Sequence, residues 1–396
     1  MTDTQPVPQS GRRLAVFLDG TWDQATGNMN VWRLKSLCRS DPGSNQQIFY
    51  SAGVGTSFGE SFRGGVFGYG IDDVLTQAYQ WLIETWQEGD ELFIFGFSRG
   101  AFAARSLSGL ISRCGLLKLG APLSIAQLYE RYRKGNAALT IHQLLEKDPA
   151  SLTKNEERWL VRYSLPIPVT FTGVWDTVGA VATNEAFHAL TGGDHSFLDV
   201  NLRKSQLNVF HALAIDENRK TFDATLLSQY VPGTDPKAPF TSPRELSSVE
   251  QRWFVGAHGN VGGGVYDDTL SQLPLRWLMD KAEKHGLLFR QKLDIDEGAG
   301  DGVVEDSFKT FLKGAYALLH VEHRHWRPIG RPPEPRTHTV VHTINETIDG
   351  SVFERWRRDG TYRPQNLADW AAAHGVEVED LKSSRSATDP SEIVPD

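Results

Sequence analysis

The chain contains a serine between two glycines at a point where a short strand is expected to end and a helix to begin. Residues 91–105 read ELFIFGFSRGAFAAR. The apolar run over residues 92–95 predicts a short buried strand, and the alanine-rich segment after the serine is a good helix former. A Gly-x-Ser-x-Gly motif in this setting is typical of a nucleophile elbow, which exposes the serine above the sheet near the positive end of the helix. We therefore expect Ser98 to be a nucleophile; the alternative is a glycine-rich turn in which Ser98 caps the helix.

Two further side chains with catalytic chemistry follow other predicted strands. The apolar segments 169–174 and 252–255 predict two short strands, and Asp176 and His258 follow shortly after them. Because the carboxyl ends of parallel strands meet at one edge of a sheet, we expect both side chains to converge on Ser98 there. The order serine, acid, histidine is that of the α/β-hydrolases. We predict an α/β fold: an α/β-hydrolase-like, mostly parallel sheet with helical insertions and a C-terminal extension.

Hydrolysis by a serine needs all three of these residue types. Serine is a poor nucleophile at neutral pH and needs a base within hydrogen-bond reach. Histidine titrates near pH 7, so His258 can take the proton of Ser98 and pass it to the leaving group. The carboxylate of Asp176 would hold the correct histidine tautomer and stabilise the imidazolium.

The developing oxyanion needs backbone N–H donors close to the nucleophile. The N–H of Arg99, directly after the serine, is one candidate. The loop at Gly20 and Thr21, which follows the apolar segment 14–18, is the second. The alternative for this loop is a strand-to-helix turn in which Asp19 caps the backbone.

Other side chains are weaker candidates. His211 is the second choice for the base, but its apolar, strand-like surroundings favour a packed, hydrogen-bonded histidine. Asp216 and Asp267 are the second choices for the acid. The Asp-Gly-Thr sequence at 19–21 also occurs in aspartate-nucleophile phosphatases, but Phe17 stands where their nucleophile would be.

The composition is that of a globular protein without a cofactor signature. The chain has 396 residues, 40% hydrophobic and 23% charged, which is ample for a large core. A net charge of -8 argues against a general affinity for nucleic acid. Cys38 and Cys114 have no metal-ligand spacing, and His320, His323 and His325 lack a carboxylate at a known zinc spacing. We expect no metal, no cofactor and no nucleic-acid partner.

The N-terminal residues 1–13 are polar and show no secretory signal, and no apolar run is long enough to cross a bilayer as a helix. We expect cytoplasmic synthesis, with secretion by a route without a cleaved signal peptide left open.

Composition and hydrophobic pattern divide the chain into four parts. We expect residues 1–13 to be disordered and residues 14–290 to form the hydrolase domain, with a helical insertion at about 117–165. Residues 291–382 are expected to form a C-terminal helical extension. The polar residues 383–396 predict a disordered tail.

Several motifs, taken as an ordered set, resemble one known family. They are FLDGTW at 17–22, GFSRGA at 96–101, GVWDTVG at 173–179, HALAIDE at 211–217, and WFVGAH at 253–258 with VGGG at 261–264. Over about residues 14–266 the chain resembles the uncharacterised α/β-hydrolase-domain family that includes type VI secretion phospholipase effectors. The resemblance implies a serine hydrolase fold with Ser98, Asp176 and His258 as the catalytic triad. Phospholipase activity belongs to certain effector members of that family.

Two positions depart from the family pattern. Asn260 stands where the family often has aspartate, and Asp23 where asparagine is common. If the usual aspartate orients the histidine or binds a cation, this chain lacks that group.

The functional hypothesis is a serine hydrolase of carboxylic esters, a phospholipase or lipase that acts through an acyl-enzyme. Its expected partners are a lipid or ester substrate, a membrane surface, and an immunity or secretion-machinery protein. Two alternatives stand beside it: an esterase on soluble substrates, and a catalytically silent binding protein on a hydrolase fold.

Overall fold

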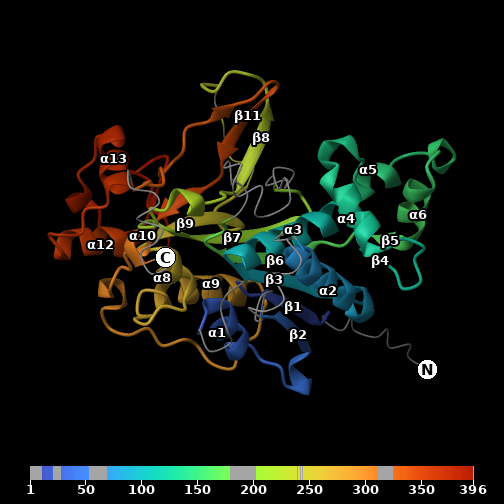
Figure 1. Ribbon diagram of the computed structural model, residues 1–396, viewed down its shortest axis with the longest axis horizontal. Coiled ribbons are helices and arrows are strands. Elements are labelled where there is room, and N and C mark those ends of the chain that lie inside the picture. The colour runs from blue at the N-terminus through green and yellow to red at the C-terminus, as the bar shows by residue number, and fades with distance from the viewer. Residues whose placement is uncertain are drawn as a thin grey trace, which may run out of the picture.

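A central sheet of eight strands organises the computed structural model, which describes residues 11–20, 28–52, 69–178, 202–238, 240, 242, 244–310 and 324–395. The strand order is β13-β12-β9-β7-β6-β3-β1-β2 (Figure 1). All neighbouring pairs are parallel except β12 and β13. The prediction of a mostly parallel α/β sheet is therefore confirmed. The strands are β1 (Arg13–Leu18), β2 (Gln46–Ser51), β3 (Glu91–Phe97), β6 (Val169–Trp175), β7 (Gln206–Ala214), β9 (Val249–Phe254), β12 (Glu346–Ile348) and β13 (Arg385–Ser386).

Helices cover both faces of this sheet, which explains why its central strands are continuous apolar runs rather than alternating ones. Alternate side chains of β1 and β3 point to opposite sides, and each side belongs to a separate hydrophobic cluster. Helices α2 (Tyr69–Thr85) and α3 (Arg99–Cys114) cover one face. Helices α1 (Asn30–Leu37) and α9 (Gln272–Lys284) cover the other.

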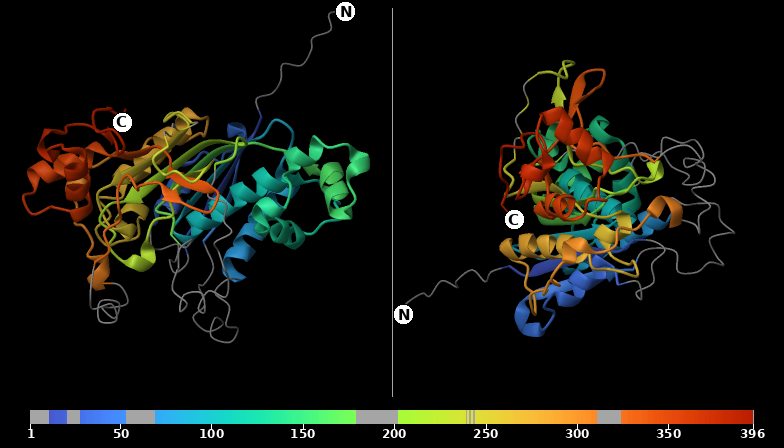
Figure 2. Two further views of the ribbon diagram at one scale, coloured as in Figure 1. Left: turned by 90° about the horizontal axis from the view of Figure 1, so that it is seen from above. Right: turned by 90° about the vertical axis from the view of Figure 1, so that its left-hand side faces the viewer.

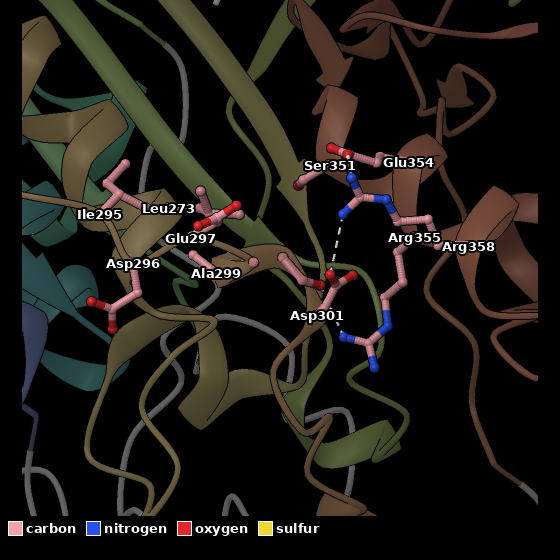
Figure 3. A pocket seen from close by; sticks show the side chains of 12 residues that line it. Leu273, Ile295, Asp296, Glu297, Ala299, Asp301, Ser351, Glu354, Arg355 and Arg358 are labelled. Carbon is pink, nitrogen blue, oxygen red and sulfur yellow. Dashed lines mark hydrogen bonds and ion pairs between the residues drawn. The ribbon is translucent and has the colours of Figure 1, made fainter.

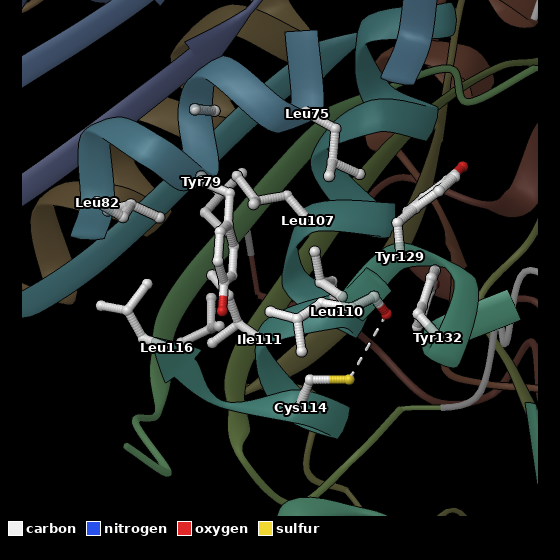
Figure 4. Packing of buried hydrophobic residues seen from close by; sticks show 14 of the residues in the cluster. Leu75, Tyr79, Leu82, Leu107, Leu110, Ile111, Cys114, Leu116, Tyr129 and Tyr132 are labelled. Carbon is white, nitrogen blue, oxygen red and sulfur yellow. Dashed lines mark hydrogen bonds between the residues drawn. The ribbon is translucent and has the colours of Figure 1, made fainter. Parts of the chain in front are cut away.

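The face under α2 and α3 contains a buried tyrosine that joins two elements (Figure 4). The Tyr79 hydroxyl donates to the carbonyl of Gly115 at 2.8 Å and accepts from the N–H of Leu117 at 3.1 Å. A buried hydroxyl needs such partners, because leaving it unpaired would cost about 1–3 kcal/mol. These bonds fix the end of α3 against α2.

The opposite face contains a row of phenylalanine rings across neighbouring strands. Phe17 stacks on Phe95 at 4.9 Å between ring centroids, Phe95 packs against Phe171 at 5.4 Å, and Phe171 stacks on Phe210 at 5.3 Å. A Cβ on Gly173 would lie 2.9 Å from the Phe95 ring, so the glycine makes room for this row.

Three short helices, flanked by two short strands, follow α3 in the range where an insertion is expected. This group comprises β4 (Leu116–Leu117), α4 (Ile125–Arg133), α5 (Ile141–Leu145), α6 (Asn155–Tyr163) and β5 (Ser164–Leu165). Helices α4 and α5 each begin with a capping box, from Ser124 to Gln127 and from Thr140 to Gln143. Figure 2 shows this group and the C-terminal helices at opposite ends of the molecule.

The C-terminal part of the chain differs from the predicted helical extension and disordered tail. β12 pairs with β9 in parallel, β13 pairs with β12, and the carbonyl of Pro395 accepts from Arg252 at 2.6 Å. These strands are too short to show a period in the sequence, and β12 pairs with a strand that lies far away in the sequence. The C-terminal segment therefore completes the central sheet instead of extending from it.

The remaining C-terminal elements pack on the same edge of the sheet. Helices α12 (Gly350–Arg358) and α13 (Gln365–His374) share a hydrophobic cluster with Trp253 of β9.

A second, three-stranded antiparallel sheet has the order β10-β11-β8. Its strands are β8 (Ser228–Pro232), β10 (Glu334–Pro335) and β11 (Thr339–Thr343). The described elements also include two short helices, α8 (His258–Gly262) and α10 (Ser307–Thr310), and several 3-10 turns.

Candidate active site

Ser98 lies in the sharp turn between β3 and α3. Its backbone angles are φ 57° and ψ -120°, a conformation that non-glycine residues adopt at strained functional sites. The flanking glycines permit this turn. A Cβ on Gly96 would lie 2.3 Å from the Gly100 carbonyl oxygen, and a Cβ on Gly100 would lie 2.2 Å from the Leu18 carbonyl oxygen. This is the geometry of a nucleophile elbow.

His258 reaches Ser98 from the end of β9. Its Nε2 lies 2.9 Å from the Ser98 Oγ. The imidazole ring packs between Phe97, at 4.6 Å between ring centroids, and the edge-on ring of Phe222, at 5.1 Å. His258 begins helix α8, after a turn at Gly256 with φ 116°. The five residues of α8 are poor helix formers, so contacts with the rest of the fold must hold this helix.

Asp176 lies just past β6 and completes a chain of hydrogen bonds. Its Oδ2 lies 2.5 Å from the His258 Nδ1, and its Oδ1 accepts from the N–H of Ala214 at 3.1 Å. Its φ of 36° is again unusual for a non-glycine residue. The structure thus brings together the three side chains that the sequence proposes as nucleophile, base and acid.

A buried arginine binds the same carboxylate, which the sequence analysis missed. Arg327 Nη1 donates to Asp176 Oδ1 at 2.6 Å and Nη2 donates to Oδ2 at 3.0 Å. Burial by itself raises the pKa of the Asp176 carboxyl, but the charge of Arg327 and the contact with His258 outweigh it and hold that pKa well below its usual range. The carboxylate is therefore ionised at neutral pH.

A second buried carboxylate holds the backbone at the histidine. Glu217 accepts from the N–H of His258 at 3.2 Å and from the Ser307 hydroxyl at 3.1 Å. It also forms a two-pronged ion pair with Arg219, with both distances 2.8 Å. The only sequence signal for Glu217 is its place in the 211–217 motif, and no local pattern shows that it reaches His258.

The predicted oxyanion loop is described as far as Gly20, and Thr21 lies outside the described residues. A Cβ on Gly20 would lie 3.8 Å from the Ser98 Cβ, so this loop lies beside Ser98. The Gly20 N–H donates to Asp19 Oδ1 at 3.0 Å, and Asp19 Oδ2 accepts from the Tyr50 hydroxyl at 3.0 Å. A role for Gly20 as an oxyanion donor would require its N–H to leave Asp19.

Arg99 is the first residue of α3, directly after Ser98. Its backbone N–H belongs to the first turn of a 16-residue helix, where the helix dipole is positive. This is the setting that the predicted oxyanion role requires.

The rival base, His211, has a different environment. Its Nε2 accepts from the N–H of Thr177 at 3.0 Å, and its Nδ1 lies 3.4 Å from Gln251 Oε1. Burial, helped by the charge of Arg105, lowers the pKa of His211 to about 3. His211 is thus a neutral, buried side chain that fixes the backbone just after Asp176.

The rival acids also have other contacts. Asp216 Oδ2 accepts from the N–H of Gly256 at 2.7 Å and from the Tyr362 hydroxyl at 3.0 Å. Burial raises the pKa of Asp216 to about 6. Asp267 accepts from the Thr269 hydroxyl at 2.6 Å. Neither carboxylate is hydrogen-bonded to His258 in the structure.

Asn260 has a role that an aspartate could not fill. Its Oδ1 accepts from the N–H groups of Ala257, at 3.1 Å, and Glu305, at 2.9 Å. Its Nδ2 donates to the carbonyl of Val303 at 3.1 Å. A carboxylate has no donor for that carbonyl. The amide therefore ties the start of α8 to the segment at 303–305. The other departing position, Asp23, lies outside the described residues.

A cavity of about 490 Å³ lies away from these residues, between the 295–301 segment and α12 (Figure 3). Arg355 donates to the carbonyls of Gly300 and Gly302, and Arg358 pairs with Asp301 at 3.2 Å. None of the three catalytic candidates lines this cavity.

The residues that the structure describes contain neither a candidate metal site nor a membrane-spanning helix. Among those residues, no group of three or more histidine, cysteine, aspartate or glutamate side chains is arranged to hold a metal ion. Two of the three clustered histidines, His320 and His323, lie outside them. None of the described helices is both long and apolar enough to cross a membrane.

The sheet and its insertions define an α/β-hydrolase-like protein. Residues 12–281 match the family model for the catalytic domain of Tle1-like phospholipase effectors of the type VI secretion system. The chain belongs to this family, and the family resemblance predicted from the sequence motifs is confirmed.

Similar proteins include one relative and two solved structures. An uncharacterized protein of Saccharomyces cerevisiae, YEL023C, is 25% identical over 230 residues, which are 54% of this chain and 32% of that protein. An uncharacterized protein from Pseudomonas aeruginosa shares 16% identity with a TM-score of 0.40, over 70% of this chain and 46% of that one. The Tle1 effector bound to the VgrG spike shares 18% identity with a TM-score of 0.33, over 66% of this chain and 52% of that one. The chain thus spans between about a third and a half of the length of these proteins.

Proposed function

We propose that this chain hydrolyses carboxylic ester bonds of phospholipids through an acyl-enzyme on Ser98. The observation that carries the proposal is the continuous hydrogen-bonded path from Ser98 Oγ to His258 Nε2, at 2.9 Å, and from His258 Nδ1 to Asp176 Oδ2, at 2.5 Å. These distances allow proton transfer without rearrangement of the side chains.

The reaction follows from the roles of these atoms. Ser98 Oγ attacks the ester carbonyl while His258 Nε2 takes its proton. Collapse of the tetrahedral intermediate breaks the bond to the alcohol, which leaves with the proton from His258. Water, deprotonated by His258, then attacks the acyl-enzyme. The bond between the acyl group and Ser98 Oγ breaks, Oγ takes the proton from His258, and the fatty acid is released. Throughout, Asp176 remains ionised and stabilises the imidazolium.

The backbone N–H of Arg99 is the proposed first donor to the oxyanion, because it begins helix α3 directly after the nucleophile. The loop at Gly20 and Thr21 is the proposed second source. In this proposal the Gly20 N–H donates to the oxyanion instead of to Asp19, or the backbone N–H of Thr21 is the donor.

Family membership supports the lipid substrate and the setting of the activity. The family is described as phospholipase effectors of a secretion system. We propose that the chain is made in the cytoplasm, is exported without a cleaved signal peptide with the help of a secretion-machinery protein, and acts at a membrane surface. An immunity protein that blocks the site is the corresponding proposed partner in a producing cell.

The domain division is also a proposal. Residues 14–290 contain the triad candidates and the helical insertion at about 117–165. The C-terminal segment supplies β12, β13 and Arg327, so we propose that it belongs to the same folding unit.

The test is fatty-acid release from phospholipid vesicles, with a short-chain soluble ester measured in parallel. Ser98→Ala should abolish both activities, whereas Ser36→Ala, which changes an exposed serine on α1, should retain them. Faster release from vesicles than from monomeric substrate supports a phospholipase. Activity on the soluble ester alone supports the esterase alternative, and no activity on either supports a silent binding protein. Equal activity of Ser98→Ala would contradict the proposed mechanism.

A further inference from the structure

The Asp176 carboxylate, the proposed triad acid, has an unusual partner. Arg327 binds both of its oxygens, at 2.6 and 3.0 Å, and neither side chain is exposed to solvent. Arg327 lies outside residues 12–281, the range that matches the catalytic-domain family. A segment beyond the family match therefore supplies a full positive charge to the innermost part of the site.

Other contacts hold the guanidinium in this position. Arg327 Nη1 also donates to the carbonyl of Ala214 at 3.0 Å, and Nη2 donates to the carbonyl of Phe222. The side-chain amide of Asn366, on α13, donates to the carbonyls of Ile215 at 2.9 Å and of Arg327 itself at 3.1 Å. The planar guanidinium matches two carboxylate oxygens at once, which a lysine ammonium cannot do.

The neighbouring carboxylates on one side already have cations of their own. Glu217 pairs with Arg219 at 2.8 Å. Asp223 pairs with Arg331 at 2.5 Å, and His325 lies 3.6 Å from it. Both carboxylates face Arg327 at longer range. Asp176 is thus the carboxylate that Arg327 contacts directly.

The groups on the other side add little charge near the histidine. His211 is neutral, because burial lowers its pKa to about 3. The guanidinium of Arg105 donates to the carbonyls of Thr225 and Leu226. The direct neighbour of His258 is therefore an ion pair with no net charge, where an unpaired aspartate would carry a full negative charge.

We propose that Arg327 is a positioning residue of the catalytic site, which holds Asp176 in line with His258 and extends the activity of the enzyme to lower pH. This inference rests on the proposed function, because it assigns a role within the same triad.

The physical reason for the pH effect is electrostatic. Burial favours the protonated form of the Asp176 carboxyl, and the charge of Arg327 opposes this effect. With Arg327 in place, Asp176 therefore remains an ionised hydrogen-bond acceptor for His258 Nδ1, and Ser98 remains activated, at lower pH than it otherwise would. Loss of the guanidinium charge should move the acid limb of the activity profile toward higher pH by about one unit.

The test measures the rate of Ser98 labelling by a fluorescent alkyl phosphonate between pH 5 and pH 9, using the full chain. Arg327→Met should move the acid limb upward by about one pH unit, which is about a tenfold loss of rate on that limb. Arg327→Lys retains the charge, so its acid limb should stay close to that of the wild type while its rate falls at every pH. Arg324→Met is the matched control, because it removes a nearby arginine whose Nη2 donates to both oxygens of Asp306, without touching Asp176.

Each outcome separates the inference from the proposed function. A wild type that is never labelled overturns the proposed serine mechanism and the inference with it. Labelling of the wild type with an unshifted acid limb in Arg327→Met overturns the role of Arg327 alone. If Arg327→Met does not fold, Arg327→Lys decides the question: wild-type rates at every pH in that variant would overturn the positioning role.

Discussion

Removal of one partner of the buried Asp176–Arg327 pair should destabilise the fold more than removal of both. The pair is two-pronged, and its two side chains are fully buried. In Asp176→Asn, the guanidinium is left without its counter-charge in a site of low polarity. Loss of one partner of a buried pair typically lowers the free energy of unfolding by about 3–5 kcal/mol. We expect that range here, which is a large part of the total stability of an ordinary protein domain.

The double variant Asp176→Asn/Arg327→Met should recover much of this loss. It leaves no buried charge uncompensated, and apolar replacements of buried ion pairs are often close to neutral in stability. Urea unfolding followed by tryptophan fluorescence would give the three differences in free energy of unfolding. We expect a coupling energy of about 2–3 kcal/mol between the two positions. If the loss of stability in the double variant equals the sum of the two single losses to within about 0.5 kcal/mol, the two charges do not depend on each other and the prediction is refuted.

The pH dependence of the free energy of unfolding tests the same ion pair independently. The pKa of Asp176 is lower in the folded protein than the value of about 3.9 expected for the unfolded chain. Its contribution to stability is therefore complete above about pH 4 and is lost as the pH falls below that value. In Arg327→Met, burial is less opposed and favours the protonated carboxyl, so this variant should gain stability relative to the wild type as the pH falls toward 4.

Three further substitutions test separate parts of the site. Gly96→Ala places a Cβ 2.3 Å from a backbone carbonyl oxygen. It should lower the free energy of unfolding by about 1–3 kcal/mol and suppress phosphonate labelling. In the control Gly360→Ala, the new Cβ meets no atom within 4 Å, so labelling should stay intact. Asn260→Asp should lower the free energy of unfolding by about 1–3 kcal/mol, measured in urea, because the amide's bond to a buried backbone carbonyl is lost; unchanged stability would contradict that role. The pKa of Asp216 is raised to about 6, so its stabilising contribution is complete below about pH 4 and is lost as the pH rises through 6; Asp216→Asn should flatten stability over this window, and an unaltered pH dependence would be evidence against it.

The parts of the fold that could be predicted from the sequence are those with a local signal. The buried strand before Ser98 is a continuous apolar run, and a serine between glycines has few other structural uses in that setting. Asp176 and His258 could be proposed because each follows a predicted strand, and parallel strands end at a common edge. Their convergence on Ser98 is a consequence of the order of strands in the sheet.

The parts that could not be predicted depend on contacts between distant residues. Arg327 lies 151 residues from Asp176, and a single arginine in a segment rich in arginine and proline carries no periodic signal. Helix α8 begins at His258 in a glycine-rich sequence that favours a loop. Asn260 and Glu217 hold it through tertiary hydrogen bonds, from Asn260 to the 303–305 segment and from the His258 N–H to Glu217. The strand pairing of β13 likewise overrides a polar composition that predicts disorder.

The most direct test of the central claim is to trap the acyl group on the enzyme. The wild type would be mixed with a phospholipid ester, quenched with acid within the first turnovers, digested, and examined by mass spectrometry. We predict a peptide whose mass is increased by one fatty acyl group on Ser98, and no such peptide from Ser98→Ala. Fatty-acid release by the wild type, with an unmodified Ser98 peptide and equal release by Ser98→Ala, would contradict the proposed nucleophile.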